Sequence, residues 1–467
     1  MMQTNRWKRR LAVLLAGGFV AVAAPPLSPP APIVQASTEL GAGGEIFPIT
    51  PQRIMDSRVP AKDVSPFGRK PTSPAGSKFS VPVTDFLDGV AQEHVLGVLV
   101  NVVIINPSRP GVLAARPTDS PATETSLVNF LAGSVVPNLG IVGVAADGSI
   151  EIDIDTASGN GEADVLVDLY GWIANSDYDD TADIGSRVVS VTPERVLDTR
   201  AESAILQGSI DVGRLKPLEI VELPVRSIGP VPNSSDVTGV VVNLTGVNAQ
   251  GGTYLSLSPQ RPTEGVEPPT STGNYIPGPP RANMAVVPIN ENGSIFIQNG
   301  LAELDALVDV IGYLRKGDDS STQTGRVVPL SNPFRSFDTR LAEFGSVRLG
   351  PTQWEDWSFT KFAESVQIGS SGGSESPIPQ QGLFGNLVAF SLQNAPLSYF
   401  TINPREPEAF SGEPPNSTLN FPRDVVVGNM TLAKYGTDGS GDDKMLSAFN
   451  RTGSAHYHLD VYAVILD

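Results

Sequence analysis

Short apolar runs separated by turn-forming residues cover most of the chain. Runs such as Leu96–Ile105, Ile150–Ile154 and Val165–Ile173 are rich in β-branched residues and are bounded by Gly, Pro, Asn and Asp, a pattern typical of β-strands joined by tight turns. Asp-Gly and Asn-Gly pairs between runs favour tight turns because both residues tolerate positive φ. No amphipathic stretch of helical period exceeds about ten residues. We therefore expect an all-β fold.

The same unit occurs three times. The segment Pro51–Arg58 recurs at Pro193–Arg200 and at Pro333–Arg340, and each copy carries Arg-x-x-Asp-[Ser/Thr]-Arg. Each copy also ends in an apolar strand that holds one acid. Other landmarks keep their order between copies, namely Pro117, Pro259 and Pro404; Asn129, Asn274 and Asn420; and Asn138, Asn283 and Asn429. Such self-similarity at a fixed period is the signature of a repeat architecture.

The third copy departs most from the other two. Gly97–Asn101 matches Gly239–Asn243, whereas the weaker third match, Gly385–Ala389, places Ala389 where the others have Asn. Any specific role of that Asn is therefore expected to be missing from the third copy.

The repeats define the expected domains. We predict three tandem antiparallel β-sandwich modules of jelly-roll type at 37–175, 186–315 and 326–467, each with roughly eight strands. The joints 174–185 and 316–325 are polar, acidic and without periodicity, as linkers are. The sequence leaves open whether the modules form a rod or a compact, trimer-like body.

The N-terminal segment 1–36 reads as a secretory signal peptide. A basic start is followed by the apolar stretch Leu11–Ala24 and by small residues at Val34 and Ala36, which is the order of a signal and its cleavage site. The apolar stretch is shorter than the ~20 residues that span a bilayer. We expect a secreted or extracellular protein with no membrane span after cleavage, and attachment to the cell wall is one form this location can take. An uncleaved N-terminal anchor is the alternative.

Composition removes several function classes. The chain has no Cys, so disulfides, zinc–thiolate sites and thiol nucleophiles are excluded. It has 32 Lys and Arg against 50 Asp and Glu, a net charge of -18, which argues against nucleic acid and anionic membrane surfaces as partners. No motif of a serine hydrolase, zinc protease or phosphate-binding loop occurs. We therefore expect no enzymatic activity, although a glycosidase needs only two carboxylates.

The repeated charged motif is the sharpest feature. On a regular strand, Asp56 and Arg58 share one face and Arg53 lies on the other. A buried Arg needs a carboxylate. We predict that the second Arg pairs with the Asp of the opening motif, or with the acid of the closing strand, and that this clasp ties the first and last strands together. An exposed Arg/Asp pair that grips a polar ligand, such as a glycan, is the alternative. The clasp residues are Arg53, Asp56, Arg58, Asp168, Arg195, Asp198, Arg200, Asp309, Arg335, Asp338, Arg340 and Asp460.

Two further groups are weaker candidates. His456, His458 and Asp460 would share a strand face and could ligate a divalent metal, although the repeat accounts for the Asp without one. Trp354 and Trp357 occur only in the third module and could stack on sugar rings or fill a local core.

Acidic segments suggest weak calcium binding at most. The joints carry Asp177, Asp179, Asp180, Asp183, Asp318 and Asp319, and a third acidic loop runs from Asp438 to Asp443. None has the spacing of a twelve-residue calcium loop. We expect solvated linkers and no cofactor.

The repeat resembles a tandem unit of exported proteins from GC-rich Gram-positive bacteria. That unit, of roughly 140 residues, opens with Arg-x-x-Asp-Thr-Arg, passes a Gly-Val strand ending in Asn-[Val/Leu]-Thr and a Ser-x-x-Asn segment, and closes with Val-Asp-Val-x-Gly-Tyr. The closest matches are Arg195–Arg200, Gly239–Thr245 and Leu307–Tyr313. The resemblance covers nearly the whole mature chain. It implies an exterior location and a non-catalytic accessory or adhesive module, and it supplies no active site.

These observations predict a secreted or cell-surface structural or adhesive repeat protein, which as a structural protein would form an elongated particle. A carbohydrate- or cell-wall-binding accessory protein is the first alternative, and a glycan-directed hydrolase is the second. The expected partners are cell-wall polysaccharide or other surface proteins.

Overall fold

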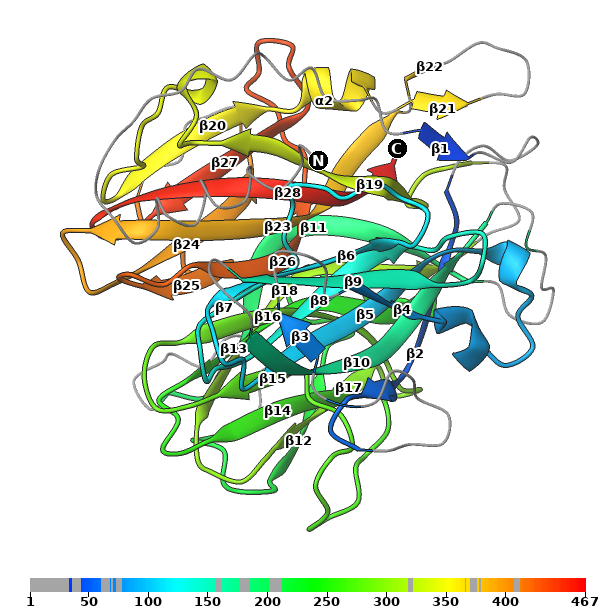
Figure 1. The fold of residues 1–467 in the computed structure, drawn as a ribbon, viewed down its shortest axis with the longest axis vertical. Helices are drawn as coiled ribbons and strands as arrows, with labels where there is room; N and C mark the ends of the chain where they lie inside the picture. The colour runs from blue at the N-terminus through cyan, green and yellow to red at the C-terminus, as the bar shows by residue number, and fades with distance from the viewer. Residues whose placement is uncertain are drawn as a thin grey trace.

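The computed structural model of the chain describes residues 33–35, 43–59, 68, 70–72, 78–156, 161–175, 178, 185–200, 212–317, 322–365, 367–369, 376–377, 379–406 and 412–467. Nearly all regular structure among them is β, arranged in antiparallel sheets (Figure 1). The predicted all-β sandwich fold is thus confirmed. Among the described residues no helix is long and apolar enough to cross a membrane.

The strands fall into three sets, which we call modules 1, 2 and 3. Module 1 contains β2 (Ile46–Asp56), β3 (Lys70–Thr72), β4 (Lys78–Val81), β5 (Val95–Ile105), β6 (Gly111–Pro117), β7 (Val128–Phe130), β8 (Val135–Gly143), β9 (Ile150–Thr156) and β10 (Gly161–Ala174). Module 2 contains β11 (Ser186–Asp198), β12 (Ile220–Pro224), β13 (Val237–Val247), β14 (Thr253–Ser258), β15 (Gly273–Tyr275), β16 (Arg281–Pro288), β17 (Ser294–Asn299) and β18 (Asp305–Lys316).

Module 3 contains β19 (Val327–Asp338), β20 (Gln353–Ser358), the helix α2 (Thr360–Ser365), β21 (Gln367–Gly369), β22 (Ser376–Pro377), β23 (Gln380–Gln393), β24 (Leu397–Pro404), β25 (Leu419–Pro422), β26 (Val427–Lys434), β27 (Met445–Asn450) and β28 (Ser454–Leu466). Short 3-10 turns lie at Val83–Phe86, Gln92–His94 and Ala342–Phe344. The remaining strand, β1 (Ile33–Gln35), precedes the predicted cleavage point and pairs in parallel with β21.

Each module has the strand order of a jelly roll. In module 1 the inner sheet runs β2-β10-β5-β8 and the outer sheet runs β4-β9-β6-β7. The same order recurs as β11-β18-β13-β16 with β12-β17-β14-β15, and as β19-β28-β23-β26 with β20-β27-β24-β25. First and last strands are therefore neighbours in every inner sheet, which is the Greek-key closure of this fold.

Burial explains why the two sheets differ in sequence. The outer strand β9 alternates buried and partly exposed residues along Ile-Glu-Ile-Asp-Ile-Asp-Thr, because only one of its faces packs on the sandwich core. The inner strand β5 is buried along almost its whole length. It must therefore be covered on both faces, once by its own outer sheet and once by the other modules.

The predicted tight turns occur at equivalent places. Gly148, Gly293 and Gly439 have φ values of 78°, 80° and 75°, a region in which Gly has no steric penalty. The turns join β8 to β9, β16 to β17 and β26 to β27. The Asp-Gly and Asn-Gly signals therefore mark one hairpin of the jelly roll three times.

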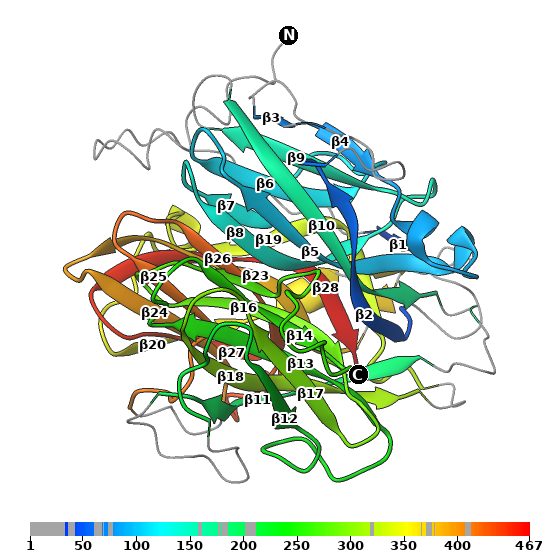
Figure 2. The same ribbon diagram turned by 90° about the horizontal axis from the view of Figure 1, so that it is seen from below.

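The three modules pack side by side around a pseudo-threefold axis and not end to end. Modules 1 (blue to cyan), 2 (green) and 3 (yellow to red) form one compact body in both views (Figures 1 and 2). The elongated particle expected of a structural protein is therefore wrong. The inner sheets of modules 1 and 2 join through the pairing of Ser186 with Ile46.

Six buried asparagines close the ring of modules. In module 3, Asn386 Nδ2 donates to Ser126 O of module 1 at 2.6 Å, and Asn138 Nδ2 of module 1 donates to Asn386 Oδ1 at 3.0 Å. Asn138 Oδ1 in turn accepts from the backbone N–H of Met430. The same contacts link module 1 to module 2 and module 2 to module 3. The asparagines are Asn101, Asn138, Asn243, Asn283, Asn386 and Asn429, all at most 4% exposed.

This register corrects the expected loss of Asn from the third copy. Asn386 pairs with Asp460 across β23 and β28, as Asn101 pairs with Asp168 and Asn243 with Asp309. Ala389 lies opposite Tyr457 instead. The similarity of the short Gly-containing runs concealed a shift of the alignment, so the third module keeps the asparagine.

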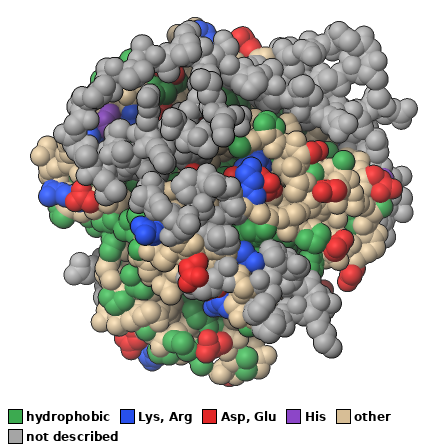
Figure 3. Space-filling model, viewed as in Figure 1, with side chains coloured by type: hydrophobic (Ala, Val, Ile, Leu, Met, Phe, Trp, Pro, Cys, Tyr) green, Lys and Arg blue, Asp and Glu red, His purple; other side chains and the backbone are tan. Residues whose placement is uncertain are grey.

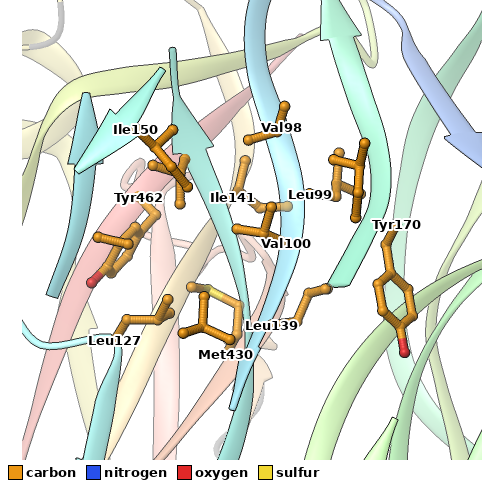
Figure 4. Packing of buried hydrophobic residues seen from close by; sticks show 14 of the residues in the cluster. Val98, Leu99, Val100, Leu127, Leu139, Ile141, Ile150, Tyr170, Met430 and Tyr462 are labelled. Atoms are coloured by element: carbon orange, nitrogen blue, oxygen red, sulfur yellow. The ribbon is translucent and has the colours of Figure 1, made fainter. Parts of the chain in front are cut away.

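Apolar packing crosses the same interfaces. The largest buried cluster combines module 1 side chains with Met284, Met430 and Tyr462 of the other two modules. In Figure 4, Met430 and Tyr462 lie among Leu127, Leu139 and Ile141. Modules 2 and 3 each keep a further cluster inside their own sandwich. The molecule therefore has a shared central core besides the cores of its sandwiches.

The starts of the three modules also meet. Glu45 Oε1 of module 1 accepts from Arg187 Nε of module 2 at 3.3 Å and from Arg326 Nε of module 3 at 3.2 Å. Gly44 and Val327 form a backbone bridge beside it. One carboxylate thus joins the beginnings of all three modules.

We expect Asn386→Ala to lower the free energy of unfolding by about 1–3 kcal/mol, because buried donors and acceptors on two modules lose their partners. Thermal unfolding of the full chain measures this effect. The exposed Asn233→Ala is the matched control and should change stability by less than about 0.5 kcal/mol. Equal melting temperatures for both variants would contradict the proposed contribution of the ring.

Candidate functional site

The repeated Arg and Asp residues form the same network in every module. Arg53 holds Asp168 of the closing strand in a bidentate pair, with Nε to Oδ1 at 2.7 Å and Nη2 to Oδ2 at 3.1 Å. Arg195–Asp309 and Arg335–Asp460 repeat this geometry. It is therefore the first Arg of the motif that joins the first and last strands.

The second Arg stays within its own motif. Arg58 Nε and Nη2 donate to the two oxygens of Asp56 at 2.9 and 2.7 Å, and Arg200–Asp198 and Arg340–Asp338 do likewise. The first Arg also lies near the opening Asp, at 3.7 Å for Arg53 Nη1 and Asp56 Oδ2. Each clasp is thus a chain of two acids and two arginines.

A β-bulge explains why the strand does not follow the regular alternation. Met55 pairs with Val167 and Arg53 pairs with Asp168, so Ile54 is an extra residue on β2. Val196 and Ser336 are the extra residues in the other modules. An extra residue shifts the following side chains to the other face. The first Arg therefore comes to lie directly opposite the closing Asp.

The closing acids of the three clasps are buried, which indicates that the Arg–Asp pairs stabilise the fold. Asp168 and Asp460 are fully buried and Asp309 is 1% exposed. Burial by itself raises the pKa of Asp338, but the hydrogen bonds and charge of Arg340 outweigh it and lower that pKa to about 2. At the closing acids Asp168 and Asp309 burial has the larger effect and raises the pKa in spite of the paired arginine.

Each clasp lies at the joint with the next module. Arg335 Nη2 donates to Glu124 O of module 1 at 3.0 Å, and Asp460 Oδ2 accepts from the backbone N–H of Ser126 at 3.2 Å. Beside the first clasp, Tyr170 Oη lies 3.2 Å from Thr272 Oγ1 of module 2. The clasps therefore stabilise the interfaces between modules as well as the modules themselves.

The metal candidate does not form a coordination site. Arg335 engages both oxygens of Asp460 and its Nη2 lies 3.1 Å from His458 Nε2, so a guanidinium already occupies the space between them. His456 contacts Thr339 and stacks on Phe390. Among the described residues no group of three potential ligands could hold a metal ion.

The two tryptophans do not form one platform. Trp357 stacks on Phe337, with ring centroids 4.5 Å apart, and donates to Tyr457 Oη at 2.6 Å. Trp354 lies an odd number of residues away on β20, and therefore on its other face, where it contacts Phe449 and donates to Gly412 O. Both tryptophans are partly buried, and Trp357 packs against the core of module 3.

The acidic segments divide into two groups. The linker acids from Asp177 to Asp183 and Asp318 and Asp319 lie outside the described residues. In the third loop, Asp438 accepts from Ser440 and Asp442 accepts from Thr360. On the face shown in Figure 3, the described acidic and basic side chains lie scattered among neutral ones and do not gather into one charged surface.

A pocket of about 910 Å³ opens between modules 2 and 3. Module 2 contributes Arg195 and Arg200 of its clasp, together with Thr245 on β13 and Leu307 on β18. The wall from module 3 comes from the segments 351–352, 394–399, 413–417 and 451–453 and from Asn420. One predicted clasp thus lines a cavity large enough for a small-molecule ligand.

Charges in the pocket are balanced. Arg451 Nε lies 2.8 Å from Glu413 Oε1, and Tyr399 Oη donates to the same oxygen at 2.9 Å. Arg195 and Arg200 hold Asp309 and Asp198. Every guanidinium of the pocket therefore has a carboxylate beside it.

Sequence analysis assigned no role to two buried polar residues of the pocket. Thr245 and Asn416 are 2% and 4% exposed, and Thr245 Oγ1 and Asn416 Oδ1 have no hydrogen-bond partner among the described residues. Thr245 closes the matched strand Gly239–Thr245 of the repeat, and Asn416 belongs to no motif. The available signal was a difference between copies, because the repeat carries Val103 and Val388 where module 2 carries Thr245.

Comparison with known proteins gives no family for the chain. No protein-family profile matches it, and no curated protein matches it. One solved structure that matches is described as "Life in the extremes: atomic structure of Sulfolobus Turreted Icosahedral Virus". The viral chain is 7% identical, the match covers 90% of this chain and 91% of that chain, and the TM-score is 0.17. A TM-score this low supports no conclusion about fold or function.

We expect Arg53→Ala to destabilise the protein by about 3–5 kcal/mol, because it leaves the buried Asp168 carboxylate without its partner. Arg58→Ala is the matched variant and should cost about 1 kcal/mol or less, since the Arg58 side chain is 43% exposed. Thermal unfolding of both full-length variants tests the ranking. A larger loss from Arg58→Ala would show that the first Arg is not the main clasp.

We expect stability to fall as pH falls through the window between about 4 and 6.5, partly because of His458. Burial first, and then the charge of Arg335, lower the pKa of His458 from 6.5 to about 4. Within that window the unfolded chain binds a proton that the folded chain excludes. His458→Leu introduces the residue found in the same register at Leu166 and Leu307. Urea unfolding at a series of pH values should show a shallower fall for this variant, and an unchanged pH dependence would refute the assignment.

Proposed function

We propose that the protein is a non-catalytic structural or adhesive body of the cell exterior. The observation that supports this most is the threefold recurrence of one buried Arg–Asp network. These arginines and aspartates occur once per module, and in each module they join paired strands. Such a repeated role in strand pairing indicates that they stabilise the fold. The predicted secretory signal and the resemblance to exported tandem repeats support the exterior location.

The compact ring of modules suits a display function. Hydrogen bonds of Asn101, Asn243 and Asn386 fix each module against the next, and the central core is shared. A body of this kind holds its outer loops in constant relative positions. Such pre-organisation lowers the entropic cost of binding a partner at those loops.

A carbohydrate- or cell-wall-binding accessory role is the second candidate, and the pocket between modules 2 and 3 favours it. Its walls combine prolines, Tyr399 and hydrogen-bonding side chains, which is the mixture of apolar surface and a few placed polar groups found in ligand sites. A hydrolase receives less support. Of the described residues lining the pocket, Glu413 is the single carboxylate, and it is engaged with Arg451 and Tyr399, whereas glycoside hydrolysis commonly uses a pair.

We expect the chain without its predicted signal peptide 1–36 to be retained on purified cell walls without releasing soluble sugar or peptide. Co-sedimentation with and without a calcium chelator, followed by analysis of the supernatant, measures both properties. An unrelated protein of similar net charge controls for non-specific retention. Steady release of soluble fragments would identify a hydrolase, and absence of retention would refute an adhesive role toward the wall.

A further inference from the structure

Module 3 lacks a buried acid that modules 1 and 2 share. In module 2 this acid is Asp305, which is 3% exposed and lies at the start of β18. Arg214 Nη2 donates to its Oδ2 at 3.0 Å, and Asn248 Nδ2 donates to the same oxygen at 2.9 Å. Asp164 and Asp305 both stand four positions before the closing acid of their module, and module 3 has His456 at that position.

The arginine that holds this acid in module 2 has an equivalent in module 3. A backbone bridge between Leu349 and Ala455 repeats one in module 2 and sets Arg348 opposite His456. Arg348 Nη1 donates to the backbone carbonyl of Ser391, and in the described part of the chain Arg348 forms no ion pair. Burial lowers the pKa of Arg348, and no carboxylate counteracts this effect. A partly buried guanidinium therefore stands here without a counter-charge.

A second arginine lies beside the first and adds to the positive charge. Arg340 Nε donates to Asp338 Oδ1 at 2.8 Å, and the Arg340 guanidinium lies 4.4 Å from the centre of the Phe390 ring. Burial first, and then the charges of Arg348 and Arg340, lower the pKa of His456 to about 4, so this imidazole is neutral near pH 7. Two guanidinium groups thus share one carboxylate, whereas the two corresponding arginines of module 2 have one carboxylate each.

We infer that module 3 binds a monocarboxylate from outside the chain at Arg348, Arg340 and His456. The planar fork of a guanidinium suits a carboxylate, and a single carboxylate supplies the charge that Asp305 supplies in module 2. All three side chains of the site are partly exposed, so a ligand can reach them. The net charge of -18 disfavours the approach of a polyanion. This inference is independent of the proposed adhesive function.

Nuclear magnetic resonance of the histidine side chains tests the inference at the site itself. The chain has three His, and the signal that His456→Asp removes is that of His456. Titration of the full-length chain with propionate at constant ionic strength should shift this signal saturably, with a dissociation constant in the millimolar range, and leave the signal of His94 unchanged. Inorganic phosphate and the neutral N-acetylalanine amide are the comparison ligands.

Arg348→Leu should weaken propionate binding about tenfold or more, because a hydrogen bond between charged groups is lost. No carboxylate loses its partner in this variant, so it should fold, which thermal unfolding verifies. Arg261→Leu is the matched control and should leave propionate binding unchanged, because the exposed Arg261 pairs with Glu264 in another module.

His456→Asp installs the residue of modules 1 and 2 and fills the anion position from within. This variant should melt at a higher temperature than the wild type and should lose the stabilisation that propionate gives the wild type. Propionate that stabilises both proteins equally would overturn the inference. The same conclusion would follow from an unsaturable shift of the His456 signal, from equal binding of the neutral amide, or from tighter binding of phosphate.

N-acetylalanine distinguishes two sources of the carboxylate, because it carries the group as the end of a peptide does. Tighter binding of N-acetylalanine than of propionate supports the site and assigns it to a peptide terminus. Equal affinities support the site and assign it to a small free acid.

Discussion

The hydrogen bonds of the buried asparagines at the module interfaces are the constraint on which the rest of the structure depends. An inner sheet with apolar residues on both faces must be covered twice, and the second cover brings backbone carbonyls such as Ser126 O into a dry interface. A carbonyl buried there needs a donor. The side-chain amide of Asn386, which also accepts from Asn138, satisfies both sides at once and so selects one arrangement of the modules.

The features that could be predicted from the sequence are those that depend on residues close together in the chain. Strand composition, Asp-Gly turns and recurring landmarks were enough for an all-β sandwich fold and its triplication. The sequence could not reveal the bulge at Ile54, because a bulge depends on how the strand pairs with its neighbour. For the same reason the alignment of the third module slipped from Asn386 to Ala389. Pairing across strands, and packing between modules, are set by contacts that no local window contains.

The candidate site shows the same division. The clasp residues were visible because they repeat, but which Arg meets which Asp followed only from the register of the strands. Thr245 and Asn416 received no role, because Thr245 was read only as the end of the strand Gly239–Thr245 and Asn416 lies in no motif. In a triplicated chain, residues that recur identify the scaffold, whereas residues that differ at equivalent positions identify where one joint has diverged. A difference between copies does not by itself mark a functional residue, since Trp357 occurs only in module 3 and yet packs against the core there.

The closed circle of contacts also limits how such a chain can evolve. Linear solenoids lengthen by adding units, because each new unit docks on the last exposed one. Here β5 faces module 2, β13 faces module 3 and β23 faces module 1 again, so the inner sheet of every module, as far as the structure describes it, is already covered. A fourth module produced by another duplication would find no inner sheet to pack against. This architecture therefore restricts the number of modules to three.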